Sequence, residues 1–116
     1  MKRGDLYWAQ LKPRSGSEQQ GRRPVVIVSN DGFNDVASWR SIIVIPVTTS
    51  PRQAGRGPTT VSLVVAGTGL SQDSIAICHQ ITTLDRSKIQ DPIGVLSEEE
   101  MRKIEKGIYA ACDLGS

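Results

Sequence analysis

The sequence predicts a mainly β (α+β) fold, a small barrel that carries one helix at its C-terminal end. Short apolar, β-branched runs recur along the chain, separated by the Gly, Pro, Asn and Asp residues typical of turns. One amphipathic helical pattern is present, and it follows all of these runs. The 116 residues fit one domain, and no repeat or linker interrupts them. We therefore expect a single domain over residues 1–116.

The expected strands differ in how deeply they should be buried. Gly4–Leu11 alternates and is rich in aromatic residues, whereas Val25–Ser29 is continuously apolar, which indicates burial on both faces. Ser41–Val47 has Pro46 near its end, so this part is expected to be an edge or a bulge. Two further segments are expected as a fourth strand and as a strand or bent pair of strands, Thr59–Val65 and Ser74–Leu84.

The C-terminal helix has a clear start signal. Ser97 as N-cap and Glu100 three residues later form a capping box, and Leu96 and Met101 can form the hydrophobic staple. Gly107 costs about 1 kcal/mol relative to Ala inside a helix, and we expect it to mark a close packing contact. The apolar face is expected to hold Met101, Ile104, Ile108, Ala111 and Cys112.

Composition excludes several classes of protein. The longest apolar runs are too short to cross a bilayer, and no signal peptide is expected at the N-terminus. Cys78 and Cys112 form no CxxC pair and are expected to be small buried residues in a reducing compartment. With one histidine, His79, a metal site and a two-histidine ribonuclease mechanism within one chain are not expected.

Charge is unevenly distributed along the chain. The net charge is +2, but residues 1–60 carry +5 and residues 61–116 carry −3. Halves of a sequence need not be halves in space. A basic N-terminal half nevertheless favours an anionic partner, with nucleic acid as the first candidate.

The segment that enters the second strand is the best candidate site. Pro24 favours the first residue of a strand and forces Arg23 into an extended conformation. Arg23 is thus held at a rigid strand entrance, beside a polar loop that carries Glu18 and Arg22. A fixed guanidinium of this kind suits a phosphate site. The alternative is a solvated arginine at the start of a strand.

Seven segments then match one family in order along almost the whole chain: Arg3–Trp8, Gly16–Gln19, Arg23–Asn30, Ile45–Thr49, Leu70–Ser74, His79–Leu84 and the acidic-capped helix from Ser97. On these segments the sequence resembles the MazF/PemK family of toxins, which are sequence-selective endoribonucleases of toxin–antitoxin pairs. The resemblance implies a compact SH3-like β-barrel of the MazF/PemK/CcdB type. It also implies a homodimer with single-stranded RNA along the dimer groove, and cleavage through the ribose 2′-hydroxyl without a metal or other cofactor.

The resemblance assigns catalytic roles to three residues. The functional arginine of the family falls on Arg23, its functional threonine on Thr48, and the loop carboxylate of some members on Glu18. Arg23 would hold the phosphate and Thr48 would donate to it or orient the 2′-hydroxyl, while Glu18 could take the 2′-proton. Thr48 could instead be an ordinary strand-end residue and Glu18 a solvated loop acid. Which groups act as general base and general acid stays open.

Other residues are candidates for RNA contact or structure. Trp8 is expected in the core, His79 as a partly buried structural residue or an RNA contact, and Trp39 either stacked on a base or at the dimer seam. Related sequences commonly have an acid at the position of His79. The expected RNA-binding residues are Ser17, Gln19, Arg22, Thr49, Arg52, Arg56 and Gln80.

The resemblance also implies partners and alternatives. A MazE-like cognate antitoxin with a disordered acidic tail is expected to lie over the basic groove of a cytoplasmic toxin that does not contact membranes. A CcdB-like poison of a topoisomerase is one alternative, although such a poison would not need Arg23, Thr48 and Glu18. A catalytically inactive RNA-binding barrel is the other.

Overall fold

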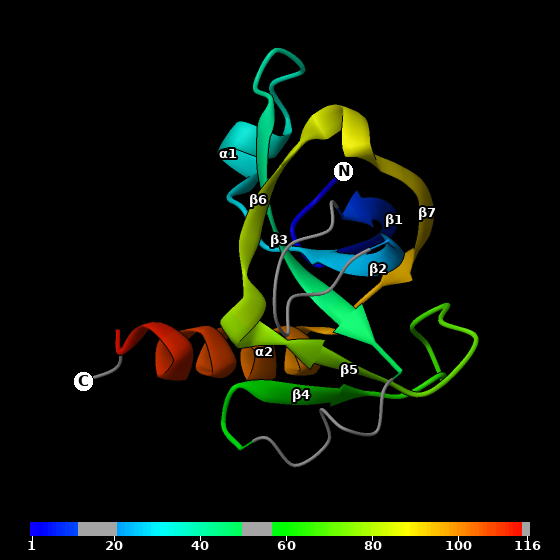
Figure 1. Ribbon diagram of the computed structural model, residues 1–116, viewed down its shortest axis with the longest axis vertical. Coiled ribbons are helices and arrows are strands. Elements are labelled where there is room, and N and C mark those ends of the chain that lie inside the picture. Colours follow the sequence, from blue (N-terminus) through cyan, green and yellow to red (C-terminus); the bar gives the residue numbers. More distant parts are fainter. Residues whose placement is uncertain (12–20, 50–56, 115–116) are drawn as a thin grey trace.

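The computed structural model describes residues 1–11, 21–49 and 57–114. In these segments the chain forms seven strands, two α-helices and two short 3₁₀ turns (Figure 1). In chain order they are β1 (Asp5–Leu11), β2 (Gly21–Ile27), α1 (Asp31–Asn34), β3 (Ser41–Thr48), β4 (Thr60–Leu63), β5 (Ser74–Ile77), η2 (Cys78–Gln80), β6 (Thr82–Asp85), η3 (Arg86–Lys88), β7 (Ile89–Val95) and α2 (Glu98–Cys112).

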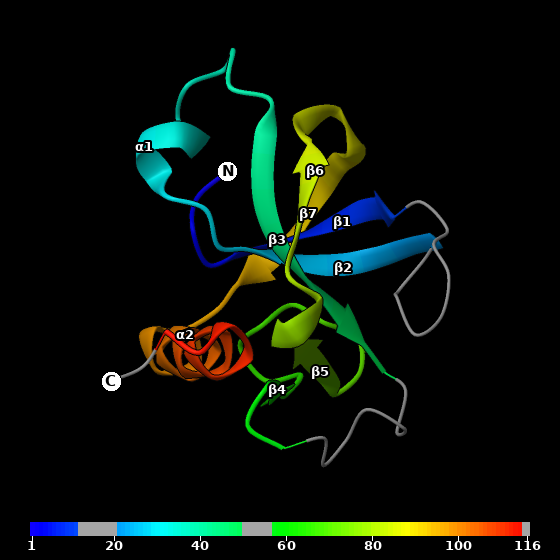
Figure 2. The same cartoon turned by 60° about the vertical axis from the view of Figure 1, so that its left-hand side comes forward.

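All strand pairs in the described part are antiparallel, in the order β4-β5-β3-β2-β1-β7. β6 pairs with β3 beside this path, and the described pairings do not close into a ring. Figure 2 shows β1 and β2 side by side, with the long β3 passing from the end near α1 to β5. The expected mainly β fold with a C-terminal helix is confirmed. The segment Ser74–Leu84, expected as a strand or a bent pair of strands, forms two strands, β5 and β6, joined by the short η2, and these three elements are called the bent arm.

Of the two expectations for Pro46, a strand edge or a bulge, the edge is confirmed on one side of β3, and no bulge interrupts its register with β2. Pro46 is buried and lies opposite Val25 of β2 in an unshifted register. On its other side, β3 pairs with β6 over residues 41–44 and with β5 over residues 47–48. Pro46 falls between these two pairings, where a residue without an N–H group removes no ladder hydrogen bond.

β2 separates two apolar cores, as its continuously apolar sequence predicts. Val25, Val26 and Ile27 are all fully buried. Val26 belongs to a core that includes Leu6, Ile45 and Ile104, under α2. Val25 and Ile27 belong to a second core on the opposite face. Apolar surface is therefore removed from water on both sides of β2, which stabilises the strand. The expectation that this strand begins at Pro24 is wrong: β2 begins at Gly21, so Arg22 and Arg23 lie within it and pair with β1.

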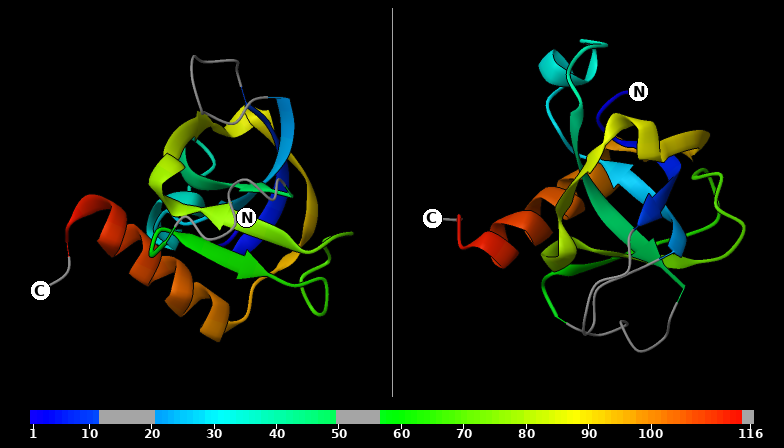
Figure 3. Two further views of the ribbon diagram at one scale, coloured as in Figure 1. Left: turned by 60° about the horizontal axis from the view of Figure 1, so that its bottom comes forward. Right: turned by 45° about the horizontal axis from the view of Figure 1, so that its top comes forward.

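The start of α2 has the capping box that its sequence predicts. The Glu100 amide donates to Ser97 Oγ at 3.1 Å, and the Ser97 amide donates to Glu100 Oε1 at 2.9 Å. Leu96, Met101 and Ile104 are buried. The expectation that Cys112 is buried is wrong, because the last turn of α2 extends past the strands (Figure 3) and leaves Cys112 exposed.

Gly107 makes the close contact that its cost in a helix predicts. Cys78 of η2 is buried against it, and a Cβ added at Gly107 would lie 2.5 Å from Cys78 Sγ. Cys78 Sγ also donates to the carbonyl oxygen of Ile104, at 3.7 Å. The missing side chain thus lets α2 pack closely on the arm between β5 and β6.

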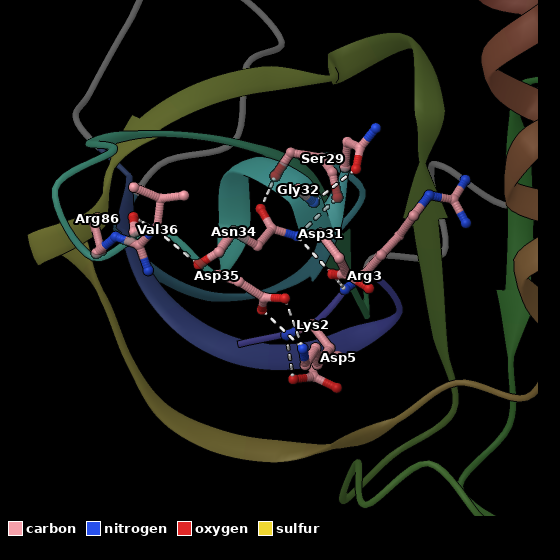
Figure 4. A network of polar contacts seen from close by, with 11 residues as sticks. Lys2, Arg3, Asp5, Ser29, Asp31, Gly32, Asn34, Asp35, Val36 and Arg86 are labelled. Atoms are coloured by element: carbon pink, nitrogen blue, oxygen red, sulfur yellow. Dashed lines mark hydrogen bonds and ion pairs between the residues drawn. The ribbon is translucent and has the colours of Figure 1, made fainter.

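A polar network holds the segment between β2 and β3 (Figure 4). Buried Asn34 donates through Nδ2 to the Ser29 carbonyl oxygen at 2.8 Å. Arg86 of η3 donates to three carbonyl oxygens of this segment, those of Asn34 (3.0 Å), Val36 (2.9 Å) and Trp39 (2.9 Å). The guanidinium thereby ties residues 34–39 to η3, far along the chain.

Candidate functional site

A groove of about 500 Å³ opens where the entrance of β2 and the end of β3 meet β7 and the β4–β5 loop. Among the described residues its lining includes two guanidinium groups, four hydroxyl side chains and one amide side chain, and no carboxylate. The lining residues are Trp8, Arg22, Arg23, Pro24, Val47, Thr48, Thr49, Gly69, Leu70, Ser71, Gln72, Ser74, Pro92 and Ile93. Two cations, with no carboxylate among the described lining residues, favour an anionic ligand.

Arg23 and Thr48, expected together at the site, both line this groove. β2 and β3 are antiparallel neighbours, and their pairing ends where Val25 lies opposite Pro46, two residues from Arg23 on β2 and two residues from Thr48 on β3. Arg23 is exposed, whereas Thr48 is 5% exposed. The same groove therefore holds an accessible charged fork and a buried hydroxyl.

The β4–β5 loop forms a second wall of the groove, and two glycines fix it there. A Cβ on Gly69 would overlap the carbonyl oxygen of Ile93 in β7, and a Cβ on Gly94 would overlap that of Thr68. Thr68 is fully buried and donates through Oγ1 to the Val64 carbonyl oxygen at 2.8 Å. The loop is thus folded on itself and pressed on β7, which carries Leu70, Ser71 and Gln72 into the groove.

Trp8 lines the groove and is half-buried, so the expectation that it belongs to the core is wrong. The Arg22 guanidinium carbon lies 4.6 Å from the centroid of the Trp8 ring. Arg22 Nη2 also donates to Asp91 Oδ2 of β7, at 2.7 Å. Trp8 lies on the same strand face as Leu6 but beyond the end of the core, where its ring supports a guanidinium instead of apolar neighbours.

Gln80 and His79, both in η2, are absent from the lining of this groove. Gln80 is half-buried, and its expected role in RNA binding stays a prediction. His79 is exposed, which contradicts the expectation of partial burial, and its Nδ1 lies 2.8 Å from Thr59 Oγ1. η2 is short and sits on the surface beside α2, so the ring points to solvent.

Trp39 lies away from the groove. Its ring stacks on Phe33 at 4.7 Å between centroids, and its Nε1 donates to the Ser41 carbonyl oxygen at 2.7 Å. The side chain is 43% exposed. Both expected roles, stacking on a base and packing at a dimer seam, remain predictions.

Five expected site residues lie outside the described segments: Ser17, Glu18, Gln19, Arg52 and Arg56. The structure describes three other expected RNA-binding residues. Arg22 and Thr49 line the groove, whereas Gln80 does not. Sequence reasoning missed Trp8 and the residues that β7 and the β4–β5 loop contribute. Leu70–Ser74 was among the matching segments, and its polar residues between two strands were the available signal.

Neither a metal-binding cluster nor a membrane-spanning helix is found in the part of the chain that the structure describes. No group of three or more His, Cys, Asp or Glu residues there could hold a metal ion. None of the described helices is long and apolar enough to span a bilayer.

The chain matches known proteins over nearly its full length. Residues 2–111 match the family model described as PemK-like, MazF-like toxin of type II toxin-antitoxin system. A curated relative, Endoribonuclease MazF of Staphylococcus saprophyticus, is 34% identical over 108 residues, which cover 93% of this chain and 88% of that protein.

Solved structures share the fold. A MazF crystal structure from Deinococcus radiodurans is 23% identical, with a TM-score of 0.79 and coverage of 97% of this chain and 96% of that chain. An endoribonuclease in complex with its cognate antitoxin, from Mycobacterial species, is 24% identical, with a TM-score of 0.76 and coverage of 100% and 98%.

Proposed function

The chain belongs to the PemK-like, MazF-like toxin family of type II toxin–antitoxin systems and is an endoribonuclease toxin. We propose that it cleaves single-stranded RNA in the groove that Arg23 and Thr48 line. The observation that carries the proposal is that both residues line one groove, from the neighbouring strands β2 and β3. A topoisomerase poison of the CcdB type would use no such pair, and the curated relative is named for endoribonuclease activity.

The proposed reaction uses the ribose 2′-hydroxyl of the RNA as nucleophile. The 2′-oxygen attacks the adjacent phosphorus and the bond to the 5′-oxygen breaks, which leaves a 2′,3′-cyclic phosphate and a 5′-hydroxyl. Charge that develops on the phosphate oxygens needs donors fixed in advance. Arg23 supplies a permanently charged fork, and the Thr48 hydroxyl supplies a neutral donor from a buried position.

The proton transfers need further groups. The 2′-hydroxyl must lose a proton and the 5′-oxygen must gain one, and a guanidinium is a poor base at neutral pH. No carboxylate lines the described groove. We propose Glu18, in the segment before β2, as the general base. The carboxylate would receive the 2′-proton, and Glu18→Gln would then lower the rate while RNA binding persists.

The proposal includes the wider contacts and partners of the toxin. Arg22 and Thr49 line the groove and would bind RNA next to the cut, together with the other expected contact residues, Ser17, Gln19, Arg52, Arg56 and Gln80. We further propose a homodimer, a location in the cytoplasm with the mRNA substrate, and neutralisation by a cognate antitoxin with a disordered acidic tail. An acidic tail suits a groove whose described charged lining is two arginines.

The test is cleavage of a long mixed-sequence single-stranded RNA with EDTA present. Wild type, Arg23→Ala and the matched control Arg102→Ala, an exposed arginine on α2, would be compared with 5′-end mapping of the products. Discrete cuts with 5′-hydroxyl ends by wild type and Arg102→Ala, reduced about 10²–10³-fold in Arg23→Ala, are expected. A folded wild type that leaves the RNA intact, or Arg23→Ala that cuts at the control rate, would overturn the proposal.

A further inference from the structure

We propose that Arg22, held over Trp8 and tied to Asp91, is a stacking platform for one unpaired nucleobase next to the scissile phosphate. This inference rests on the proposed function, because it takes single-stranded RNA as the ligand of the groove. It gives Arg22 a role different from that of Arg23, since the flat face of the guanidinium, and not its charge alone, would contact the RNA.

The first observation is that Arg22 is held in place from two sides. Its guanidinium carbon lies 4.6 Å from the centroid of the Trp8 ring, and its Nη2 donates to Asp91 Oδ2 at 2.7 Å. A guanidinium with both contacts loses little further freedom when a ligand arrives. The side chain is still 53% exposed, so a base can reach it without displacing either contact.

The second observation is the backbone that presents Asp91. Trp8 pairs with Gln90 and Tyr7 with Pro92, so Asp91 is an extra residue in β7 and forms a bulge opposite β1. Its φ of 60° lies in the left-handed region, which a residue other than glycine adopts only at a cost. Glycine would adopt this backbone conformation at lower cost. The hydrogen bond and ion pair that the Asp91 carboxylate makes with Arg22 therefore offset the cost of the strained backbone. Bulges of this kind re-aim side chains beside functional sites.

The third observation is the position of the pair between two cavities. Trp8 and Arg22 line the groove of Arg23 and Thr48, and both also line a neighbouring cavity of about 210 Å³. Ser87, Lys88 and Gln90 contribute to that second cavity. A strand of RNA whose phosphate lies at Arg23 can therefore place the adjacent base over Arg22 and continue toward Lys88.

These features fit a nucleobase better than a second phosphate. Bases of single-stranded RNA stack on arginine planes as well as on aromatic rings. A phosphate at Arg22 would have to compete with the Asp91 carboxylate, which already occupies an edge of the guanidinium. Within residues 1–11, 21–49 and 57–114, Trp8 is the one aromatic ring found on this guanidinium, and the side chain is 53% exposed.

The test compares binding of two uncleavable chains, a short oligothymidylate and an abasic chain of the same length. Neither has a 2′-hydroxyl, and every base offers a stacking face, so neither cleavage nor a sequence motif is needed. The dissociation constants would be measured for wild type, Arg22→Lys and the matched control Arg102→Lys. Lysine keeps the charge of Arg22 and removes its plane.

Wild type and Arg102→Lys are expected to bind the abasic chain about tenfold to a hundredfold more weakly than oligothymidylate. In Arg22→Lys this ratio should fall to within a few fold of one. Asp91→Asn removes the carboxylate charge, and asparagine also adopts the left-handed backbone found at this position. This variant should lower the ratio, but by less than Arg22→Lys does. Trp8→Leu, checked for folding by circular dichroism, should lower the ratio as Arg22→Lys does.

A ratio that is the same in Arg22→Lys as in wild type would overturn the platform, because Arg22 would then contribute charge only. This outcome is separate from failure of the proposed function, which the cleavage assay with EDTA reports. A toxin that cuts RNA with an unchanged ratio keeps its proposed function and has no platform. A protein that cuts no RNA, but whose ratio depends on Arg22, has the platform without the proposed function.

Discussion

Gly69 and Gly94 lie in backbone contact where the β4–β5 loop crosses β7. A Cβ on Gly69 would approach the Gly94 Cα to 3.4 Å and would overlap the Ile93 carbonyl oxygen. Both segments that meet here line the groove, the loop through Leu70 and its neighbours and β7 through Ile93. The crossing of two glycines therefore sets the distance between two walls of the site.

Gly94→Ala is expected to push these walls apart. The added methyl group would meet the Thr68 carbonyl oxygen, and backbone atoms can give way only if the loop moves. We expect a loss of roughly 1–3 kcal/mol in the free energy of unfolding, the cost typical of overpacking, and a lower kcat/KM for RNA cleavage. Urea unfolding and a cleavage assay would measure both.

Gly67→Ala is the matched control in the same loop. Gly67 has φ of 81° but nothing within 4 Å of an added Cβ, so the variant bears only the backbone strain of about 1–2 kcal/mol. Its cleavage activity should remain close to that of wild type. Equal activity of Gly94→Ala and wild type would contradict the proposed role of the crossing.

Gly107→Ala should destabilise the protein although alanine is the better helix former. Alanine gains about 1 kcal/mol in a free helix, but the methyl group would lie 2.5 Å from Cys78 Sγ. We expect a net loss of roughly 1–3 kcal/mol in the free energy of unfolding. Cys78→Ala removes the sulfur, so Gly107→Ala should cost markedly less in that background. Additive effects of the two substitutions in urea unfolding would show that the contact is not the cause.

Features encoded in local sequence were predictable here. The capping box of Ser97 and Glu100 depends on residues three apart, and the burial of Val25–Ile27 depends on one apolar run. The prediction that Arg23 and Thr48 share one site came from the family resemblance, and both residues line the same groove.

Features set by pairing of distant segments were not predictable. Trp8 reads as a core residue, because nothing near it in the sequence reveals that Asp91 forms a bulge and holds a guanidinium over its ring. Cys112 continues the apolar helix face but lies beyond the sheet that would cover it. The length of a neighbouring sheet cannot be read from the periodicity of a helix.

The Thr48 hydroxyl is expected to matter for catalysis. Thr48→Val keeps the shape of the side chain and removes the donor from a residue that is 5% exposed. If the hydroxyl donates to the reacting phosphate, kcat should fall by about 10²-fold with little change in KM. Thr48→Ser restores the donor and should recover most of kcat.

Thr83→Val, at an exposed position of β6, is the matched control and should leave kcat unchanged. Thermal unfolding of Thr48→Val needs to be measured alongside, because a buried hydroxyl can also contribute to stability. If Thr48→Val and Thr48→Ser lose kcat equally, the hydroxyl is not the group that acts.

Cys78 should make the stability of the protein depend on pH in the alkaline range. Burial raises the pKa of the Cys78 thiol from 9.0 to about 11, because the thiolate is disfavoured in an apolar site. The unfolded chain therefore loses this proton first as pH rises. The stabilisation is complete below about pH 9 and is lost between about pH 9 and 11, by up to about 1.4 kcal/mol per pH unit.

The measurement is the free energy of unfolding in urea from pH 8 to 11 for wild type, Cys78→Ala and Cys112→Ala. Groups other than the two thiols titrate in all three proteins, so differences between them isolate each cysteine. Wild type and Cys112→Ala should lose more stability with rising pH than Cys78→Ala does, since Cys112 is exposed. Parallel curves for wild type and Cys78→Ala would mean that the buried thiol ionises as readily as it does in the unfolded chain, and that the site beneath α2 admits water.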